Sequence, residues 1–170
     1  MHTRAEIEEA FTAYQTEVDR IVKASDWAAF ANMFTEDATY REHAYGDFSG
    51  RAEITTWITK TMGSYPGNLM NGFPIGWYVI DEPTSRVICD VRNLMPDPGD
   101  GSELEASNIT ILTYAGNGLW SCEEDIYNPA KFLELAKSWA HIAAEHGNLT
   151  PEGQSFLAAV SPGGQRPRSR

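Results

Sequence analysis

The sequence predicts an α+β fold: a curled antiparallel sheet with three N-terminal helices on its concave face. Three observations lead to this prediction. Amphipathic helical patterns cover residues 3–23, 25–34 and 50–62, and one short strand-like run, residues 38–43, interrupts them. Four longer strand-like runs then follow one another, joined only by short turns, which makes neighbouring strands antiparallel. A long sheet twists, so with helices on one side we expect a cone-shaped α+β barrel around a pocket.

The helices are indicated by their caps and apolar stripes. Thr3 followed by Glu6 is a capping box for the first helix, and Ser25-Asp26 predicts the cap of the second. Asn128-Pro129 is typical of a helix start, with Asn as the cap and Pro at the first helical position. Gly147 ends that helix, which is an addition on the C-terminal side of the sheet.

The chain divides into one domain and a short extension. We expect residues 1–147 to form the conical domain and residues 148–170 a C-terminal extension. Thr150-Pro151 predicts a last short helix through Val160. The Gly/Pro-rich end carries a basic cluster at 166–170, and this composition is typical of a disordered terminus.

Side chains alternate between the two faces of a strand, and this alternation sorts the candidate functional residues. The four strand-like runs are residues 73–80, 86–95, 104–114 and 119–127. Three sets of polar side chains share a strand face: Tyr40 with Glu42, Asp90 with Arg92, and Glu123 with Asp125 and Tyr127. Arg41 and His43 lie on the face opposite Tyr40 and Glu42, and we expect His43 at a rim or an interface.

Composition excludes several classes of function. The net charge of -11 argues against a nucleic-acid partner, which would need a clustered basic face. The start lacks the apolar core of a signal sequence, and no run approaches the ~20 apolar residues of a membrane span. Cys89 and Cys122 lack metal or redox spacing, so we interpret them as free thiols of a cytoplasmic protein. The four histidines are scattered and no Gly-rich phosphate loop is present, so we expect neither a metal nor a cofactor.

Four sequence segments together resemble the nuclear transport factor 2-like superfamily and, within it, the SnoaL-like proteins. These segments are FTEDATY (34–40), GRAEI (50–54), YAGNGLW (114–120) and EEDIYNP (123–129). The similarity spans residues 5–135 and implies the conical fold and a homodimer formed through the outer face of the sheet, where we expect apolar residues such as Val91 and Ile126. The superfamily hosts isomerases, dehydratases, polyketide cyclases, epoxide hydrolases and non-catalytic binding modules, so the fold does not fix the function.

Similarity to limonene epoxide hydrolase-like members implies one version of the site. Those members hold a water with a Tyr and an Asn, and an Asp-Arg-Asp set activates the water and protonates the epoxide. Tyr40 stands at the Tyr position and Glu42 at the Asn position, while Asp90 and Asp125 stand at the positions of the two acids. The position of the Arg holds an isoleucine, but Arg92 lies on the same strand face and could reach the site.

Similarity to ketosteroid isomerase-like members implies another version. Glu42 stands at the position of their general base. Their oxyanion hole combines a Tyr of the first helix with a strand Asp, and here Val18 and Thr110 fall at or near those positions, with Tyr14 one turn before Val18. The oxyanion hole is therefore not reproduced.

These comparisons lead to a candidate site with two alternative interpretations. If the faces of Asp90 and Asp125 both point into the cone, crowded and desolvated carboxylates have at least one raised pKa, which suits acid/base catalysis. The alternative is that Arg92 pairs with these acids as a structural ion pair. The candidate catalytic residues are Asp125, Asp90, Arg92, Tyr40 and Glu42, and the candidate substrate-binding residues are Tyr14, Trp77, Asn108, Glu123 and Tyr127.

Two functions follow from the sequence. The first is a cofactor-independent enzyme that acts by general acid/base chemistry on a small, mostly apolar molecule in a closed pocket. Its reaction would be like that of an epoxide hydrolase, isomerase, dehydratase or cyclase. The second is a non-catalytic ligand-binding or protein-interaction module of the same fold.

Overall fold

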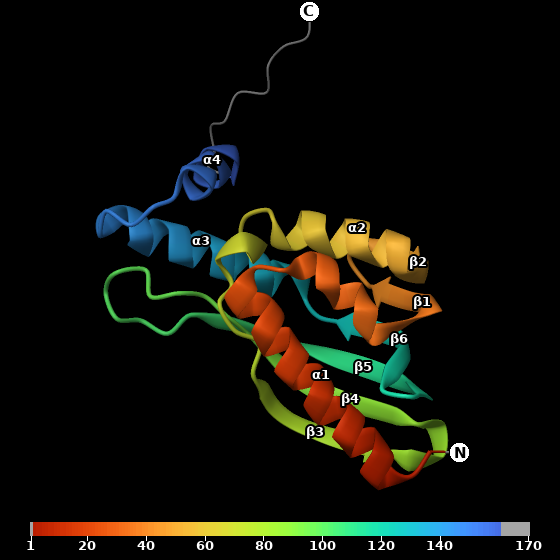
Figure 1. The fold of residues 1–170 in the computed structure, drawn as a ribbon. Helices are drawn as coiled ribbons and strands as arrows, with labels where there is room; N and C mark the ends of the chain where they lie inside the picture. Colours follow the sequence, from red (N-terminus) through yellow and green to blue (C-terminus); the bar gives the residue numbers. More distant parts are fainter. Residues whose placement is uncertain (1, 161–170) are drawn as a thin grey trace, which may run out of the picture.

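The computed structural model describes residues 2–160 and has the predicted α+β architecture (Figure 1). The α-helices are α1 (Arg4–Ala24), α2 (Gly50–Met62), α3 (Pro129–Glu145) and α4 (Pro151–Val160). Short 3-10 helices are η1 (Trp27–Met33), η2 (Gly67–Leu69) and η3 (Glu82–Thr84). The strands are β1 (Phe34–Glu42), β2 (Gly46–Ser49), β3 (Ile75–Asp81), β4 (Arg86–Leu94), β5 (Glu105–Gly116) and β6 (Leu119–Ile126).

The strands form one six-stranded open sheet in the order β2-β1-β6-β5-β4-β3. The segment from β3 to β6 is the predicted antiparallel meander, but β1 pairs with β6 in parallel, so the sheet is mixed and not closed. The predicted antiparallel pairing does not extend to this pair, because short turns determine the direction of consecutive strands only. The parallel register places Tyr40 beside Glu123 and Glu42 beside Asp125.

The local sequence explains how the first helices begin and end. The Thr3 side chain accepts a hydrogen bond from the Glu6 amide at 3.3 Å, as the capping box predicts, and Ser25 ends α1 in the left-handed region at φ 53°. The second predicted helix is the 3-10 helix η1, and Asp26 makes no side-chain capping bond there. The sequence pattern predicts a helical segment here, but it does not distinguish a 3-10 helix from an α-helix.

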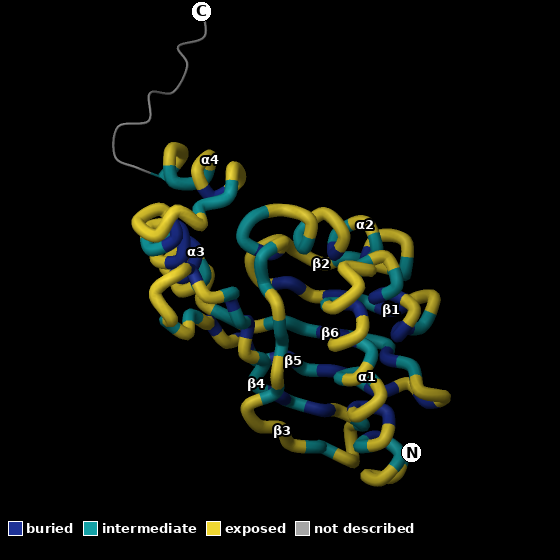
Figure 2. The backbone as a smooth tube through the Cα atoms, turned by 60° about the vertical axis from the view of Figure 1, so that its left-hand side comes forward, coloured by how far each residue is buried: buried dark blue, intermediate teal, exposed yellow. Residues whose placement is uncertain are grey.

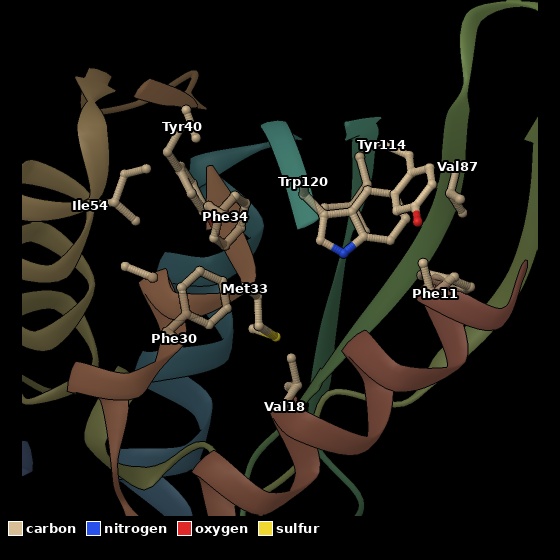
Figure 3. Packing of buried hydrophobic residues seen from close by; sticks show 14 of the residues in the cluster. Phe11, Val18, Phe30, Met33, Phe34, Tyr40, Ile54, Val87, Tyr114 and Trp120 are labelled. Carbon is tan, nitrogen blue, oxygen red and sulfur yellow. The ribbon is translucent and has the colours of Figure 1, made fainter. Parts of the chain in front are cut away.

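The main core lies between the helices and the inner face of the sheet (Figure 3). Side chains from α1, η1, α2 and the strands converge there, and Trp120 is 1% exposed at the centre. The Trp120 ring lies 6.0 Å from the Tyr14 ring and 5.3 Å from the Tyr114 ring. Buried residues alternate along β5, which identifies its inner face (Figure 2).

The C-terminal part forms a second, smaller core. Leu135 and Trp139 of α3 pack with Met95 and Ala106 at the end of the sheet, and α4 packs against α3. The predicted disorder of the basic tail falls outside the described residues. Among residues 2–160, no helix combines the length and the apolar character needed to cross a bilayer.

Candidate functional site

A cavity of about 720 Å³ lies between the inner face of the sheet and the helices. This volume falls within the range of small-molecule pockets, ~300–1,000 Å³. Its walls are mostly aromatic and aliphatic, and include Tyr14, Trp27, Phe30, Tyr40, Phe48, Trp57, Phe73, Tyr127 and Phe132. The polar groups gather on the strand side, at Glu42, Asn93, Asn108, Thr110, Glu123 and Asp125.

Asp125, on β6, is the most heavily hydrogen-bonded of these groups. Its Oδ1 accepts from the Thr110 hydroxyl at 2.5 Å and from the Asn108 Nδ2 at 3.0 Å. Its Oδ2 accepts from the hydroxyl of Tyr40, on the neighbouring strand β1. The side chain keeps some accessible surface because it opens onto the cavity. Two adjacent strands therefore orient one carboxylate toward the pocket.

Glu123 lies two residues before Asp125 on the same strand face. Its Oε2 accepts a hydrogen bond from the Tyr14 hydroxyl at 3.0 Å, so α1 supplies the partner. The side chain is only 4% exposed. The site thus contains two carboxyl groups, each with its own phenol donor, roughly 7 Å apart along the strand by the usual rise per residue.

Burial changes the protonation of this pair. Burial raises the pKa of Asp125 to about 6, although the hydrogen bonds from Thr110 and Tyr40 oppose this rise. Burial also raises the pKa of Glu123 well above its usual value, and the neighbouring Asp125 charge raises it further. Burial and these two carboxylates likewise raise the pKa of both the Tyr14 and Tyr40 phenols. Near neutral pH the pair can hold a proton at Glu123 and a negative charge at Asp125.

Glu42 has a different local role. Its Oε2 accepts from the backbone amides of Ala44 and Tyr45, at 2.8 and 2.6 Å, and so fixes the turn between β1 and β2. The Glu42 side chain is 4% exposed and lines the cavity. Burial and a hydrogen bond to Glu42 raise the pKa of Tyr127. Glu42 is therefore a carboxylate of the cavity wall that is already held by the backbone.

Asn93 is a site residue that the sequence analysis missed. Its Nδ2 donates to the Asn108 Oδ1 at 2.8 Å, and the Asn108 Nδ2 in turn donates to the Thr110 Oγ1 at 2.8 Å. This chain of amides and hydroxyls ends at Asp125. The signal was present in the sequence, because Asn93 shares a strand face with the apolar residues Val87, Cys89 and Val91.

Asp90 and Arg92 lie outside the cavity, so the prediction that they converge with Asp125 was wrong. On β4 the buried side chains are Val87, Cys89 and Asn93, and the alternation directs Asp90 and Arg92 to the opposite face. Arg92 forms an ion pair there with Glu105 of β5. The apolar side of β4 faces the core, which the sequence analysis did not use to orient this strand.

Trp77 also lies on the outer face of the sheet, where it is 50% exposed and opposite Asp90 in the β3–β4 register. Its predicted place in the pocket was wrong because, as for Asp90, the face of the strand that points inward was misassigned.

Two apolar residues were expected on the outer face. Val91 instead lines the cavity, whereas Ile126 is 38% exposed on the outer face as expected. The structure brings together the other predicted site residues in one cavity: Tyr14, Tyr40, Glu42, Asn108, Glu123, Asp125 and Tyr127.

Comparisons with known proteins agree with this architecture. A family model described as a SnoaL-like domain matches residues 1–109. A search of curated proteins finds no match.

Solved structures of similar fold cover most of the chain. One is a protein from Catenulispora acidiphila with a ketosteroid isomerase-like fold, solved in complex with trimethylamine (20% identity, TM-score 0.58, covering 75% of this chain and 91% of that chain). An LEH-like epoxide hydrolase from Mycobacterium tuberculosis shows 11% identity and a TM-score of 0.60, covering 86% of this chain and 95% of that chain. An NTF2-like protein from Anabaena variabilis shows 14% identity and a TM-score of 0.56, covering 75% and 93%. At these identities the likeness shows the fold.

Proposed function

Because the chain belongs to the SnoaL-like domain family and holds a carboxyl pair in an apolar cavity, we propose that it is an enzyme acting by general acid/base chemistry on a small, mostly apolar molecule. Asp125 is the base and Glu123 is the acid. This assignment replaces the pair of Asp90 and Asp125 expected from the sequence. No metal or organic cofactor is needed for such chemistry.

One observation carries the proposal: two carboxyl groups of one strand face share a cavity, and their surroundings separate their protonation states. The burial of Glu123 beside a charged Asp125 favours its protonated form near neutral pH. Burial raises the pKa of Asp125 to about 6, and three hydrogen-bond donors limit this rise. Asp125 is therefore mostly ionised at neutral pH. A general acid and a general base work best when their pKa values lie near the working pH.

Hydrolysis of an epoxide is the sharpest version of this function. Asp125 takes a proton from water as the water oxygen bonds to one epoxide carbon. The C–O bond of that carbon breaks, and Glu123 gives its proton to the released oxygen, so the product is a vicinal diol. A proton then passes from Asp125 to Glu123 through solvent, which restores the starting state. Tyr40 orients Asp125 throughout.

The donors around Asp125 favour hydrolysis over isomerisation through an enolate. An enolate needs hydrogen-bond donors aimed at its developing oxygen charge. Thr110 and Asn108 both give their donors to Asp125 instead. Isomerisation, dehydration or cyclisation by the same acid/base pair remains the second version of the proposal.

The test is turnover of a panel of epoxides and polyketides by the wild type and two variants. Asp125→Asn should lower kcat/KM by two orders of magnitude or more, since general acid/base catalysis contributes ~10²–10⁴-fold. Asp90→Asn is the matched control, because it makes the same change on the outer face and should leave turnover unaltered. Unchanged turnover in Asp125→Asn would remove this residue from the mechanism.

A non-catalytic binding module is the second candidate. The observation in its favour is that three donors already satisfy Asp125, as in a static polar network. Under this alternative, ligands would raise the melting temperature of the wild type without being consumed. Turnover of any panel compound that depends on Asp125 would decide for the enzyme.

A second copy of the chain is the proposed partner. Trp77, Val79 and Ile126 are exposed on the outer face of the sheet, at 50%, 51% and 38%. Exposed apolar groups of this kind favour an interface. We propose a homodimer formed through this face, and a cytoplasmic location stays a prediction.

A further inference from the structure

The cavity gathers three carboxyl groups without a buried positive partner. Glu42 and Glu123 are each 4% exposed, and Asp125 opens into the same space. Their hydrogen-bond partners are hydroxyls, an amide and backbone N–H groups, all of them neutral. Within residues 2–160, none of these three carboxylates forms an ion pair. Among the cavity-lining residues that the structure describes, Lys60 is the one cation, and it lies at an exposed position of α2.

Buried carboxyl groups without a cation are costly, because removing a charge from water is offset only by an opposite charge or by hydrogen bonds. Burial raises the pKa of both Glu123 and Asp125. A positively charged ligand would supply the missing partner. It would stabilise the ionised form of the adjacent Asp125, by a Coulomb attraction that is strong in a poorly solvated cavity.

Aromatic rings cover the cavity wall next to these carboxylates. The ring centroids of Phe30 and Tyr40 are 6.3 Å apart, those of Tyr40 and Trp57 are 4.6 Å apart, and those of Phe48 and Trp57 are 4.9 Å apart. Trp27 extends this row, 6.2 Å from Phe30. The faces of aromatic rings attract cations, and Trp is the best of them. The apolar wall and the acidic wall therefore favour the same ligand charge.

We propose that the natural ligand of this cavity is an organic cation: an ammonium group next to the Asp125 and Glu42 carboxylates, carried by an apolar body against the aromatic wall. The proposal rests on the proposed function only in taking this cavity as the reaction site. A bare metal ion fits less well, since in the described chain no three His, Cys, Asp or Glu side chains are placed to hold one. The charged head would fix the substrate while Asp125 and Glu123 act on the adjacent uncharged group.

The test uses three probes of matched shape and different charge: tryptamine (cationic near pH 7), tryptophol (neutral) and indole-3-acetate (anionic). Their dissociation constants for the full-length wild type are measured by isothermal titration calorimetry. Tryptamine should bind about tenfold or more tightly than tryptophol, since even a screened pair at an effective dielectric constant of ~20 exceeds the ~1.4 kcal/mol that a factor of ten requires. Indole-3-acetate should bind most weakly.

Two isosteric variants locate the effect. Asp125→Asn should reduce the preference for tryptamine over tryptophol by several fold, and Glu124→Gln should leave it unchanged. Glu124 is the matched control because it neighbours Asp125 on β6 but faces outward, where it pairs with His43. A comparison of the two ligands within one variant cancels any general change in folding.

The outcomes separate this inference from the proposed function. Equal affinity for tryptamine and tryptophol, tighter binding of indole-3-acetate, or no binding of tryptamine at millimolar concentration would overturn the cation proposal. Asp125-dependent turnover of a neutral epoxide would still support the enzyme in each case. Preferential binding of tryptamine without any turnover would support the cation site and count against catalysis.

Discussion

The hydrogen bond from Tyr40 to Asp125 predicts how the pH dependence of activity responds to one substitution. Tyr40→Phe removes a single hydroxyl from a ring that is 3% exposed and keeps the ring packed. That hydroxyl favours the ionised form of Asp125 and so lowers its pKa against the effect of burial. Its loss should therefore raise the pKa of Asp125.

The size of this change follows from the bond. A hydrogen bond to a charged group contributes roughly 1.5–3 kcal/mol net, and one pKa unit corresponds to about 1.4 kcal/mol. Thr110 and Asn108 still donate to Asp125, so we take the lower end and expect a rise of about one unit, to about 7. The charge of Glu42 also raises the pKa of Asp125, and this effect remains in the variant.

The assay is the pH profile of kcat/KM, whose acidic limb should move up by about one pH unit in Tyr40→Phe. Tyr78→Phe is the matched control. Its hydroxyl donates to the Glu8 carboxylate at 2.8 Å on the surface, so its removal should leave the profile in place. An acidic limb that stays fixed or moves to lower pH in Tyr40→Phe would refute the reasoning.

Three other predictions concern stability and assembly. The pKa of Asp125 rises on folding from ~3.9 to about 6, so its protonation favours the folded state below pH ~4 and this contribution is lost as pH rises through 6. The free energy of unfolding of Asp125→Asn, measured with urea, should therefore rise relative to that of the wild type by about 3 kcal/mol from pH 4 to pH 7. A difference between the two proteins that stays constant over this pH range would contradict the prediction. Trp120→Ala should cost ~3–5 kcal/mol by the same measurement, because the ring is 1% exposed, and a cost below 1 kcal/mol would contradict the packing described. Trp77→Glu should convert a homodimer into a monomer in sedimentation equilibrium, and an unchanged mass would place the interface elsewhere.

Sequence reasoning reached most of the fold because local patterns dictate it. The apolar stripe and the capping box determine α1, and turn residues separate the strands of the meander. The pattern could not show that β1 pairs in parallel with β6, since that contact joins distant segments and has no local signature. It also gave no sign that β2 would pair with β1, because four residues are too few for a clear alternation.

The candidate site was predicted one strand at a time, and the prediction was correct for β6 and wrong for β4. Alternation correctly separated Glu123 and Asp125 from Glu124 on β6. On β4 the alternation was also correct, but the choice of which face points inward was wrong for Asp90. That choice rested on the family resemblance at Asp90, whereas the burial of Val87 and Cys89 decides it in the structure.

The parallel pairing of β1 with β6 brings together side chains that lie far apart in the sequence. The phenol of Tyr40 and the carboxylate of Asp125 are 85 residues apart, and closing such a loop costs on the order of 4 kcal/mol in chain entropy. The segment that matches the SnoaL-like domain ends at residue 109, before either Glu123 or Asp125. The matched segment therefore contains Tyr40 and Glu42 of the cavity wall, whereas β6 contributes Glu123 and Asp125 from outside it. A substitution in β6 can therefore alter the carboxyl pair of the cavity while the segment that matches the family stays unchanged.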